Sequence, residues 1–370
     1  MIKHLMEQLD YSSCNYMAVD CIKRELEANG FENLDLSSRV ELKTGHKYYA
    51  VRNDSAIMAF ITGTADAGDA GFRIISAHSD SPCFKLKPMP EIYGDGGVVS
   101  LNVEKYGGGI MYTWFDRPLS ISGRVAIRTD NPLRPEMRLI DLRRPVATIP
   151  HLAIHFNRAV NEGNPLSVQK DMKPVLGIYD KSEFEKMRSR GGVVKCMIAE
   201  ECGVEPEDIL STELVLYPYA NAVLSGVHNE LLQSARIDDL SMAFTGLAAL
   251  LRSAAVKPET PYTRILAIFD NEETGSGTRQ GAAAPTLRNL LHRVAGSDES
   301  FYRALERTFM ISADDAHAWH PNYNEKYDPT NHPVINGGPV IKINANCKYM
   351  TDSRGAAVFA GLCDKAGVAY

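Results

Sequence analysis

The sequence has 370 residues, of which 44% are hydrophobic and 23% charged, and its formal net charge at pH 7 is -6. This is an ordinary globular composition, and the length suggests two domains or one large one. The mild acidity and the lack of a Lys/Arg block argue against a nucleic-acid partner.

The cysteines and the first residues bear on where the protein works. The seven cysteines include no Cys-x-x-Cys pair, which indicates reduced, intracellular thiols rather than a disulfide framework or a cysteine zinc site. The segment MIKHL at 1–5 lacks the apolar core of a signal peptide. No apolar run approaches the roughly 20 residues of a membrane span. We therefore expect a cytoplasmic protein with no membrane partner.

The first part of the chain alternates helix and strand signals. Cys14, Ala18, Ile22 and Leu26 form an i, i+4 row that predicts a helix over 13–30, with Gly30 as its end. Short apolar runs then predict strands at 48–52, 56–62 and 74–77.

The texture changes between roughly residues 85 and 229. Gly and Pro become frequent, and short β-branched runs recur, as at 97–103 and 119–127. This pattern predicts an inserted, mainly β domain. The charged, helix-forming segment 171–203 is expected to be an exposed excursion from it.

From residue 234 the α/β texture returns. Leu240, Phe244, Leu247 and Leu251 make a helical stripe, which Asp239 or Ser241 can cap. A strand at 265–269, a helix at 285–295 and a strand at 309–312 follow. The fold class is therefore α/β.

The strand predicted at 265–269 ends abruptly in Asp270-Asn271-Glu272-Glu273. If the chain stays extended there, adjacent side chains point to opposite sides. One glutamate can then hold a metal while the other faces water, a division that metal-assisted hydrolysis needs. Taken alone, the stretch also fits an acidic surface turn.

Three more predicted strand or helix boundaries carry similar groups. They are HSD at 78–80, RIDD at 236–239 and DDAH at 314–317. Ligands in open α/β sheets gather at the carboxyl ends of the strands, and one histidine with several carboxylates suits Zn, Mn or Co. In this arrangement Asp80 can accept the second N–H of the His78 imidazole. Asp238 can either cap a helix or bridge two ions.

Two further histidine pairs lie close in the sequence, and the spacing of the first allows shared metal ligation. His317 and His320 lie three apart, and His151 and His155 lie four apart. Local hydrogen bonding is the default role for the first pair, and a structural role is the default for the second.

Together, several segments make the sequence similar to the aspartyl aminopeptidase family of dizinc metallopeptidases, nearly from end to end. They are SAHSDSP at 76–82, YTWFDRPL at 112–119, HLAIH at 151–155, SARIDDL at 234–240, FDNEETGSG at 269–277, SAD at 312–314, HAWHPNY at 317–323 and GPVIK at 338–342.

The resemblance implies a particular architecture. Residues 1–88 and 230–370 would form a catalytic domain with a mixed sheet flanked by helices, and residues 89–229 an inserted β-rich dimerisation domain. Trp114 and Phe115 are expected at or near a subunit interface. Members of the family commonly form dodecamers built from dimers.

The resemblance also implies roles for single residues. Four of them match the positions that hold two zinc ions, which Mn or Co can replace: His78, Asp238, Glu273 and Asp314, with Asp238 as the bridge. Glu272 matches the general base, and Asp80 the carboxylate behind the metal-binding histidine. His155 matches a histidine that reaches the active site of a neighbouring subunit.

The expected function is removal of N-terminal residues from peptides, with a preference for Asp or Glu. An acidic substrate side chain needs a cation, and Lys342 is the candidate, on an expected strand over 338–344. Tyr349, His317 and His320 would complete its pocket.

One feature departs from the family pattern. Family members continue past the position of Tyr370, with a metal-binding histidine in a Ser-Met-His segment that this sequence does not contain. Either the sequence is a fragment or the second metal site is incomplete. The missing segment supports one alternative to the peptidase, a noncatalytic assembly or binding protein with an incomplete metal site. A second alternative is a related metallo-deacylase, which acts on a different amide.

Overall fold

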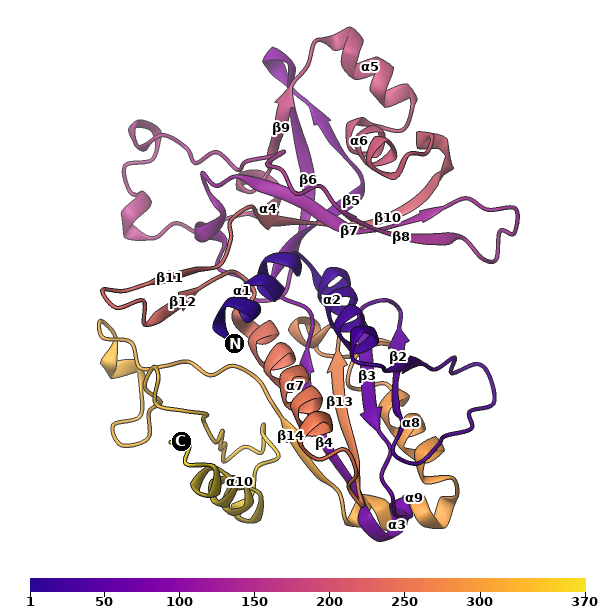
Figure 1. Cartoon of the computed structure of the whole chain (residues 1–370). Helices are drawn as coiled ribbons and strands as arrows, with labels where there is room; N and C mark the ends of the chain where they lie inside the picture. Colours follow the sequence, from indigo (N-terminus) through magenta and orange to yellow (C-terminus); the bar gives the residue numbers. More distant parts are fainter. The chain divides into compact units, whose positions relative to one another are not determined.

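The computed structural model describes residues 1–370 and divides the chain into two compact units, Met1–Ala313 and Asp314–Tyr370. Figure 1 shows their elements, and each unit is described by itself.

The first unit contains a six-stranded sheet in the order β1-β2-β3-β13-β4-β14. Its strands are β1 (Glu32–Asn33), β2 (Lys47–Arg52), β3 (Ala56–Ile61), β4 (Phe72–His78), β13 (Thr263–Phe269) and β14 (Phe309–Ser312). β4 runs parallel to both β13 and β14, whereas β3 runs antiparallel to β2 and β13. The sheet is therefore mixed, as expected, and the strands predicted for it are confirmed.

Helices cover both faces of this sheet (Figure 1). One face packs on α2 (Asn15–Ala28) and α7 (Ile237–Val256), through a core that includes Leu26, Leu247 and Leu266. The other face packs on α8 (Thr286–Ala295) and α9 (Asp298–Glu306). Every residue of β13 is buried, as expected of a central strand covered on both sides. Helices α1 (Ile2–Tyr11) and α3 (Ala67–Ala70) complete this part.

Helix α7 confirms the predicted stripe but differs from expectation in two respects. Its length and mean hydropathy of 1.2 would suffice to cross a membrane. However, Leu240, Phe244 and Leu247 lie in the core against the sheet, so α7 is a core helix. Neither Asp239 nor Ser241, the expected caps, is the N-cap residue of α7, which is Arg236 without a side-chain cap, and Asp238 and Asp239 have non-helical backbone angles in its first turn.

A second six-stranded sheet, in the order β8-β7-β10-β5-β6-β9, belongs to the same unit and is antiparallel throughout. Its strands are β5 (Cys83–Tyr93), β6 (Val98–Tyr106), β7 (Leu119–Ile127), β8 (Glu136–Asp141), β9 (Val175–Ile178) and β10 (Ile209–Pro218). Trp114, expected at or near a subunit interface, is a buried core residue here, with its ring 4.9 Å from that of Phe84.

Residues 171–203 are not the exposed excursion that their charge suggested. They follow α4 (Val168–Asp171) and form α5 (Lys181–Ser189) and α6 (Val193–Cys202). Val194 and Ile198 of α6 are buried in the core of the second sheet. The hairpin of β11 (Val223–Ser225) and β12 (Leu231–Gln233) then leads back to α7.

Arg124 on β7 links the two sheets. Its Nε donates to Glu213 Oε2 at 2.5 Å, within the second sheet. Its Nη1 donates to Asp54 Oδ2 at 3.0 Å and to the Asn53 carbonyl at 2.9 Å, in the turn between β2 and β3. The side chain is only 8% exposed, so it forms a largely buried tie between the sheets.

The second unit, Asp314–Tyr370, is mostly irregular and ends in α10 (Ser353–Ala366). The strand expected at 338–344 is wrong, because no strand forms there and Ile343 is 72% exposed.

Candidate metal centre and active site

The site begins where β4 and β13 end side by side. His78, the last residue of β4, pairs with Phe269, the last residue of β13. Asn271 then takes a left-handed conformation with φ 64°, and Glu272–Thr274 forms a 3-10 turn. The expectation that Glu272 and Glu273 are extended is therefore wrong.

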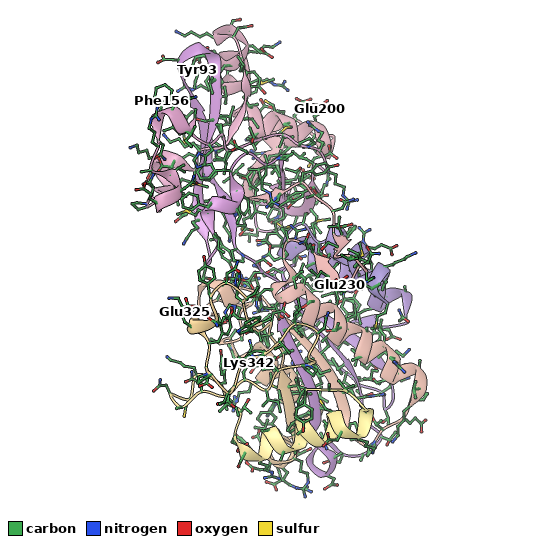
Figure 2. All side chains as sticks on the ribbon, turned by 90° about the vertical axis from the view of Figure 1, so that its left-hand side faces the viewer. Tyr93, Phe156, Glu200, Glu230, Glu325 and Lys342 are labelled. Carbon is green, nitrogen blue, oxygen red and sulfur yellow. The ribbon has the colours of Figure 1, made fainter.

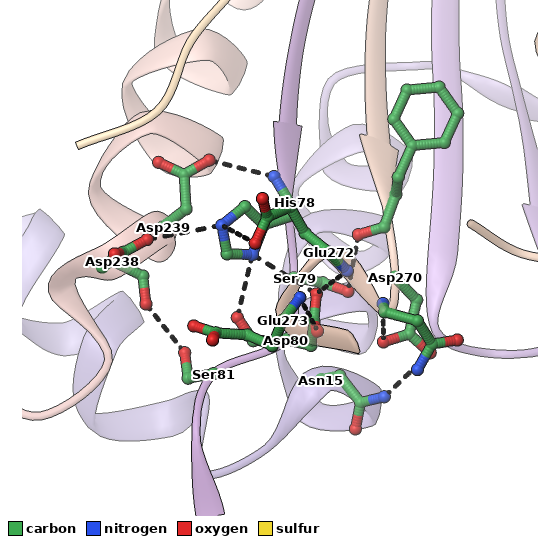
Figure 3. A network of polar contacts seen from close by, with 12 residues as sticks. Asn15, His78, Ser79, Asp80, Ser81, Asp238, Asp239, Asp270, Glu272 and Glu273 are labelled. Atoms are coloured by element: carbon green, nitrogen blue, oxygen red, sulfur yellow. Dashed lines mark hydrogen bonds and ion pairs between the residues drawn. The ribbon is translucent and has the colours of Figure 1, made fainter. Parts of the chain in front are cut away.

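His78 is 4% exposed, and its two ring nitrogens face different groups (Figure 3). Nδ1 lies 3.3 Å from Asp80 Oδ1 and 3.0 Å from the Asp80 carbonyl oxygen. Nε2 lies 3.3 Å from Asp238 Oδ1 and 3.9 Å from Glu272 Oε2. Burial alone would lower the pKa of His78, but contacts with Asp238 and Asp80 outweigh it and raise the pKa to about 11. The surroundings of this imidazole are thus strongly negative.

Asp80 is buried behind His78 and is held from several sides. Its Oδ2 accepts from the Tyr106 hydroxyl at 2.6 Å and from Glu273 N at 3.2 Å, and its Oδ1 accepts from Glu272 N at 3.2 Å. Burial would raise the pKa of Asp80, but the hydrogen bonds from His78 and Tyr106 hold it below its usual value. Asp80 therefore stays ionised and orients the imidazole.

Asp238 and Asp239 are joined by a cis peptide bond and have different surroundings. The Asp238 side chain is 58% exposed and faces His78 Nε2, while Ser81 Oγ donates to its carbonyl at 2.9 Å. Asp239 is fully buried, and its Oδ2 accepts from the His78 backbone N–H at 3.0 Å. A carboxylate oxygen of Asp239 also lies within 4.8 Å of a His78 ring nitrogen. One aspartate thus faces the ring, and the other anchors the backbone beneath it.

Glu272 and Glu273 point to different neighbours despite lying in one turn. The Glu272 side chain is 56% exposed and directs Oε2 toward His78. Glu273 Oε2 faces the N–H of Gly108 at 3.5 Å, in the loop that follows β6. Burial is the main cause that raises the pKa of Glu273, followed by the nearby charges of Asp238 and Asp80.

A cavity of about 490 Å³ opens beside these carboxylates. Asp80, Asp238 and Glu273 contribute to one part of its lining, and the second sheet and its loops contribute to another. The residues from the latter include Lys85, Tyr106, Trp114 and Arg117. The volume is in the range of small-molecule sites, so the cavity has room for a short peptide.

The remaining expected site residues lie elsewhere in the chain. Asp314 follows Ala313, whose N–H donates to the Ser76 carbonyl beyond the end of β14. Within Asp314–Tyr370, Lys342 Nζ donates to Asp314 Oδ2 at 2.7 Å and lies 5.7 Å from the Tyr349 ring centroid.

The three remaining histidines expected at the site are His317, His320 and His155. His320 Nδ1 accepts from Asn322 N at 3.2 Å, which is the local hydrogen bonding expected, and His317 is exposed. His155 lies on an exposed 3-10 turn, Ile154–Phe156, and does not line the cavity. Figure 2 shows its neighbour Phe156, which is 81% exposed.

Two residues of the site have no counterpart among those expected from the sequence. Asn271 donates from Nδ2 to the Tyr106 hydroxyl at 2.9 Å, and its Oδ1 accepts from Thr278 and Gln280. Tyr106 precedes three glycines, which read as a turn. Nothing in its local pattern signals a contact with Asp80, 26 residues away.

The donor set fits zinc. An imidazole nitrogen and carboxylate oxygens are zinc ligands, and His78 Nε2 faces the carboxylates of Asp238 and Glu272. A carboxylate behind the other ring nitrogen, here Asp80, is the usual partner of a metal-binding histidine.

The comparisons with known proteins agree with this chemistry. The family of aminopeptidase I zinc metalloproteases (M18) matches residues 8–370. A probable M18 family aminopeptidase 2 from Clostridium acetobutylicum is 43% identical over 372 residues, covering 100% of this chain and 84% of the relative. A probable M18 family aminopeptidase 2 from Pseudomonas aeruginosa is 39% identical, covering 98% of this chain and 82% of the relative.

Solved structures share the fold. Ape4 in its complex with Nbr1 superposes with a TM-score of 0.93 at 32% identity, covering 99% of this chain and 73% of that one. The mApe1 dodecamer of S. cerevisiae superposes with a TM-score of 0.86 at 25% identity, covering 99% of this chain and 83% of that one. Together with the family match over residues 8–370, these findings show that the chain belongs to the M18 family of zinc metallo-aminopeptidases.

Proposed function

We propose that this aminopeptidase removes N-terminal Asp or Glu from peptides, with two zinc ions held by His78, Asp238, Glu273 and Asp314. The observation that carries the proposal is the orientation of His78. Asp80 holds Nδ1, so that Nε2 faces Asp238 and Glu272 at 3.3 and 3.9 Å. Mn or Co can take the place of zinc at such a donor set.

Each carboxylate has a separate task in this proposal. Asp238, which faces His78 from an exposed position, would contact both ions. Glu273 is a ligand whose carboxylate is steadied by the N–H of Gly108. Asp314 follows Ala313, whose N–H bonds to the Ser76 carbonyl just after β14. Its match to the family makes it the last member of the proposed ligand set. When bound there, zinc polarises the scissile carbonyl and makes water more acidic.

Glu272 is the general base. Its carboxylate lies on the same side of His78 as Asp238 but is more than half exposed, so that it is accessible to water. It takes a proton from the attacking water and passes it to the leaving amine. The cavity between the carboxylates and the second sheet receives the rest of the peptide.

Specificity for an acidic N-terminal residue rests on Lys342 in this proposal. Its side chain is 21% exposed and is paired with Asp314, with Tyr349 close by. With Asp314 engaged by zinc, this partly buried ammonium would pair with a substrate carboxylate, because an apolar side chain would leave it without a strong counter-charge. His317 and His320 would supply the other polar groups of the pocket.

Assembly and location complete the proposal. A solved relative is described as a dodecamer, and we propose a homo-oligomer built from dimers through residues 89–229. His155, on its exposed turn, would then reach the active site of a neighbouring subunit. We place the enzyme in the cytoplasm.

The test compares kcat/KM for Asp, Glu, Leu and Ala aminoacyl substrates, with zinc content measured on the same samples. We expect the acidic substrates to be preferred and Lys342→Met to lower the acidic-to-apolar ratio at least about tenfold. Lys348→Met, a change of the same charge in the same unit, should leave the ratio unaltered. An unchanged ratio in Lys342→Met removes Lys342 from the pocket, and a wild-type preference for Leu overturns the acidic specificity.

A further inference from the structure

Tyr106 joins the second sheet to the centre of the metal site. It is the last residue of β6, and its hydroxyl donates to Asp80 Oδ2 at 2.6 Å. The same hydroxyl accepts from Asn271 Nδ2 at 2.9 Å. Asn271 is fixed in turn, because its Oδ1 accepts from Thr278 at 2.7 Å and from Gln280 at 2.8 Å. The phenol is therefore held between two partners that belong to the catalytic sheet and its loops.

The bond to Asp80 is the shortest that this carboxylate makes. Its other contacts are the Nδ1 of His78 at 3.3 Å and the backbone N–H groups of Glu272 and Glu273, each at 3.2 Å. Those three come from the strand ends themselves, whereas Tyr106 comes from the second sheet. Short O–H···O⁻ hydrogen bonds are the stronger kind, so Tyr106 contributes strongly to fixing Asp80.

The ring of Tyr106 is also held in place. Lys85 on β5 places its Nζ 4.1 Å from the ring centroid, within cation–π range. Lys85 and Tyr106 both line the cavity.

The next two residues approach the other side of the site. Gly107 has φ +71°, and a Cβ on it would lie 3.0 Å from both the Cβ and the Oε2 of Glu273. Gly108 N faces Glu273 Oε2 at 3.5 Å. The positive φ and the close approach both require glycine at position 107. The segment 106–108 thus touches both the carboxylate behind His78 and a proposed ligand.

We propose that Tyr106 is a positioning residue. By fixing Asp80, it keeps the Nε2 of His78 facing the metal. Metal affinity and turnover therefore depend on how the second sheet, which carries Tyr106, is positioned against the catalytic sheet. This inference rests on the proposed function, since it assigns His78 to the metal. Removal of the hydroxyl would leave Asp80 Oδ2 with its weaker contacts and the Asn271 amide without its phenol acceptor.

The experiment measures zinc affinity as well as activity in Tyr106→Phe. Zinc-stripped protein is titrated against a chromogenic chelator of known affinity, and kcat and KM are measured on an N-terminal Asp substrate. Loss of a direct partner of a metal-binding histidine typically costs about 10–100-fold. Tyr106 acts one step further out, through Asp80, so we expect zinc affinity to fall by roughly tenfold, the low end of that range. We also expect kcat to fall, with little change in KM.

The matched control is Tyr93→Phe. Tyr93 lies on β5 of the same sheet, and its hydroxyl meets the Tyr179 carbonyl at 3.4 Å, with no contact to Asp80. It should retain wild-type zinc affinity and kcat. Gly107→Ala is a second variant, and it should also lose zinc affinity, because its new methyl group would push against Glu273.

The outcomes separate cleanly. If Tyr106→Phe binds zinc as wild type does, the positioning role is wrong whatever Gly107→Ala does, while the proposed function stands. An equal drop in melting temperature for the zinc-free and zinc-loaded forms of Tyr106→Phe, without a change in affinity, would mark a structural residue and overturn the inference. A wild-type protein that neither binds zinc nor cleaves peptides refutes the proposed function itself.

Discussion

At the scale of single residues, the site depends on how neighbours in the sequence are turned apart. The side chains of Glu272 and Glu273 point to different neighbours because Asn271, in a left-handed conformation, leads into a 3-10 turn. The alternation of side chains along a strand is not the cause. Asp238 and Asp239 separate likewise, one toward the His78 ring and the other toward its backbone. In both pairs one carboxylate stays exposed, and the other is partly or fully buried.

The assignment of Glu272 as the base gives a direct prediction. Glu272→Gln keeps the shape of the side chain but removes its basicity, so kcat should fall by roughly 10²–10⁴-fold. Zinc content should stay close to that of wild type, because His78, Asp238 and Glu273 are unaltered. Glu299→Gln, an exposed change on α9, serves as the control. A near-normal kcat in Glu272→Gln would show that another group takes the proton.

At the scale of elements, Arg124 is the clearest tie between the second sheet and the catalytic sheet. It bonds to Glu213 on β10 and to Asp54 and Asn53 beyond β2. Its carboxylate partners are about half exposed, at 53% and 46%, so solvent weakens each pair. All of these bonds are nevertheless made by one guanidinium group that is almost completely buried.

Replacing this residue tests the tie. Arg124→Met should lower the free energy of unfolding by about 2 kcal/mol, because several charge-assisted hydrogen bonds are lost together. Urea denaturation followed by circular dichroism measures the change. Arg188→Met on α5, which breaks a largely exposed pair with Glu185, should cost less than about 0.5 kcal/mol. Equal effects of the two substitutions would show that Arg124 is not a tie.

Local sequence patterns predicted the elements whose burial they encode. β3 is apolar throughout, β4 contains the apolar pair Ile74-Ile75 and β13 the apolar run 265–269, and each forms a strand. The alternating segment 338–344 failed because a strand also needs a partner, and none pairs with it. Helix α6 was hidden by the charge around it, although a few residues such as Ile198 suffice to bury one face.

The candidate site shows the same limit. Strand ends in the sequence singled out His78, Asp80, Asp238 and Glu272, and the structure gathers these four around the His78 ring. Tyr106 was not predicted, because its proposed role arises from contacts with Asp80, 26 residues away, and with Asn271, 165 residues away. A local pattern carries no information about such a contact.

At the scale of the whole molecule, the proposed metal ligands come from distant parts of the chain. His78 ends β4, Asp238 lies in the first turn of α7 and Glu273 lies in the turn after β13. An ion bound by such groups acts as a cross-link that exists only in the folded state.

Removal of the metal is therefore expected to lower stability. At free zinc 100-fold above its dissociation constant, binding stabilises the fold by about 2.7 kcal/mol. Treatment with a chelator should lower the melting temperature by several degrees, and added zinc should restore it. His78→Ala should show little response to either treatment. A wild-type melting temperature that ignores the chelator would contradict a zinc site in the folded chain.

The position of β13 has a consequence for synthesis on the ribosome. β13 lies between β3 and β4 in the sheet but begins at Thr263, long after β4 ends at His78. At roughly 5–20 residues per second, synthesis takes on the order of 10–40 s to pass from the end of β4 to the start of β13, the strand that lies between β3 and β4 in the sheet. All six strands of the second sheet emerge in that interval, between Cys83 and Pro218. The inserted sheet can therefore be complete while β3 and β4 still expose unpaired edges, and this is the stage at which the newborn chain most needs a chaperone.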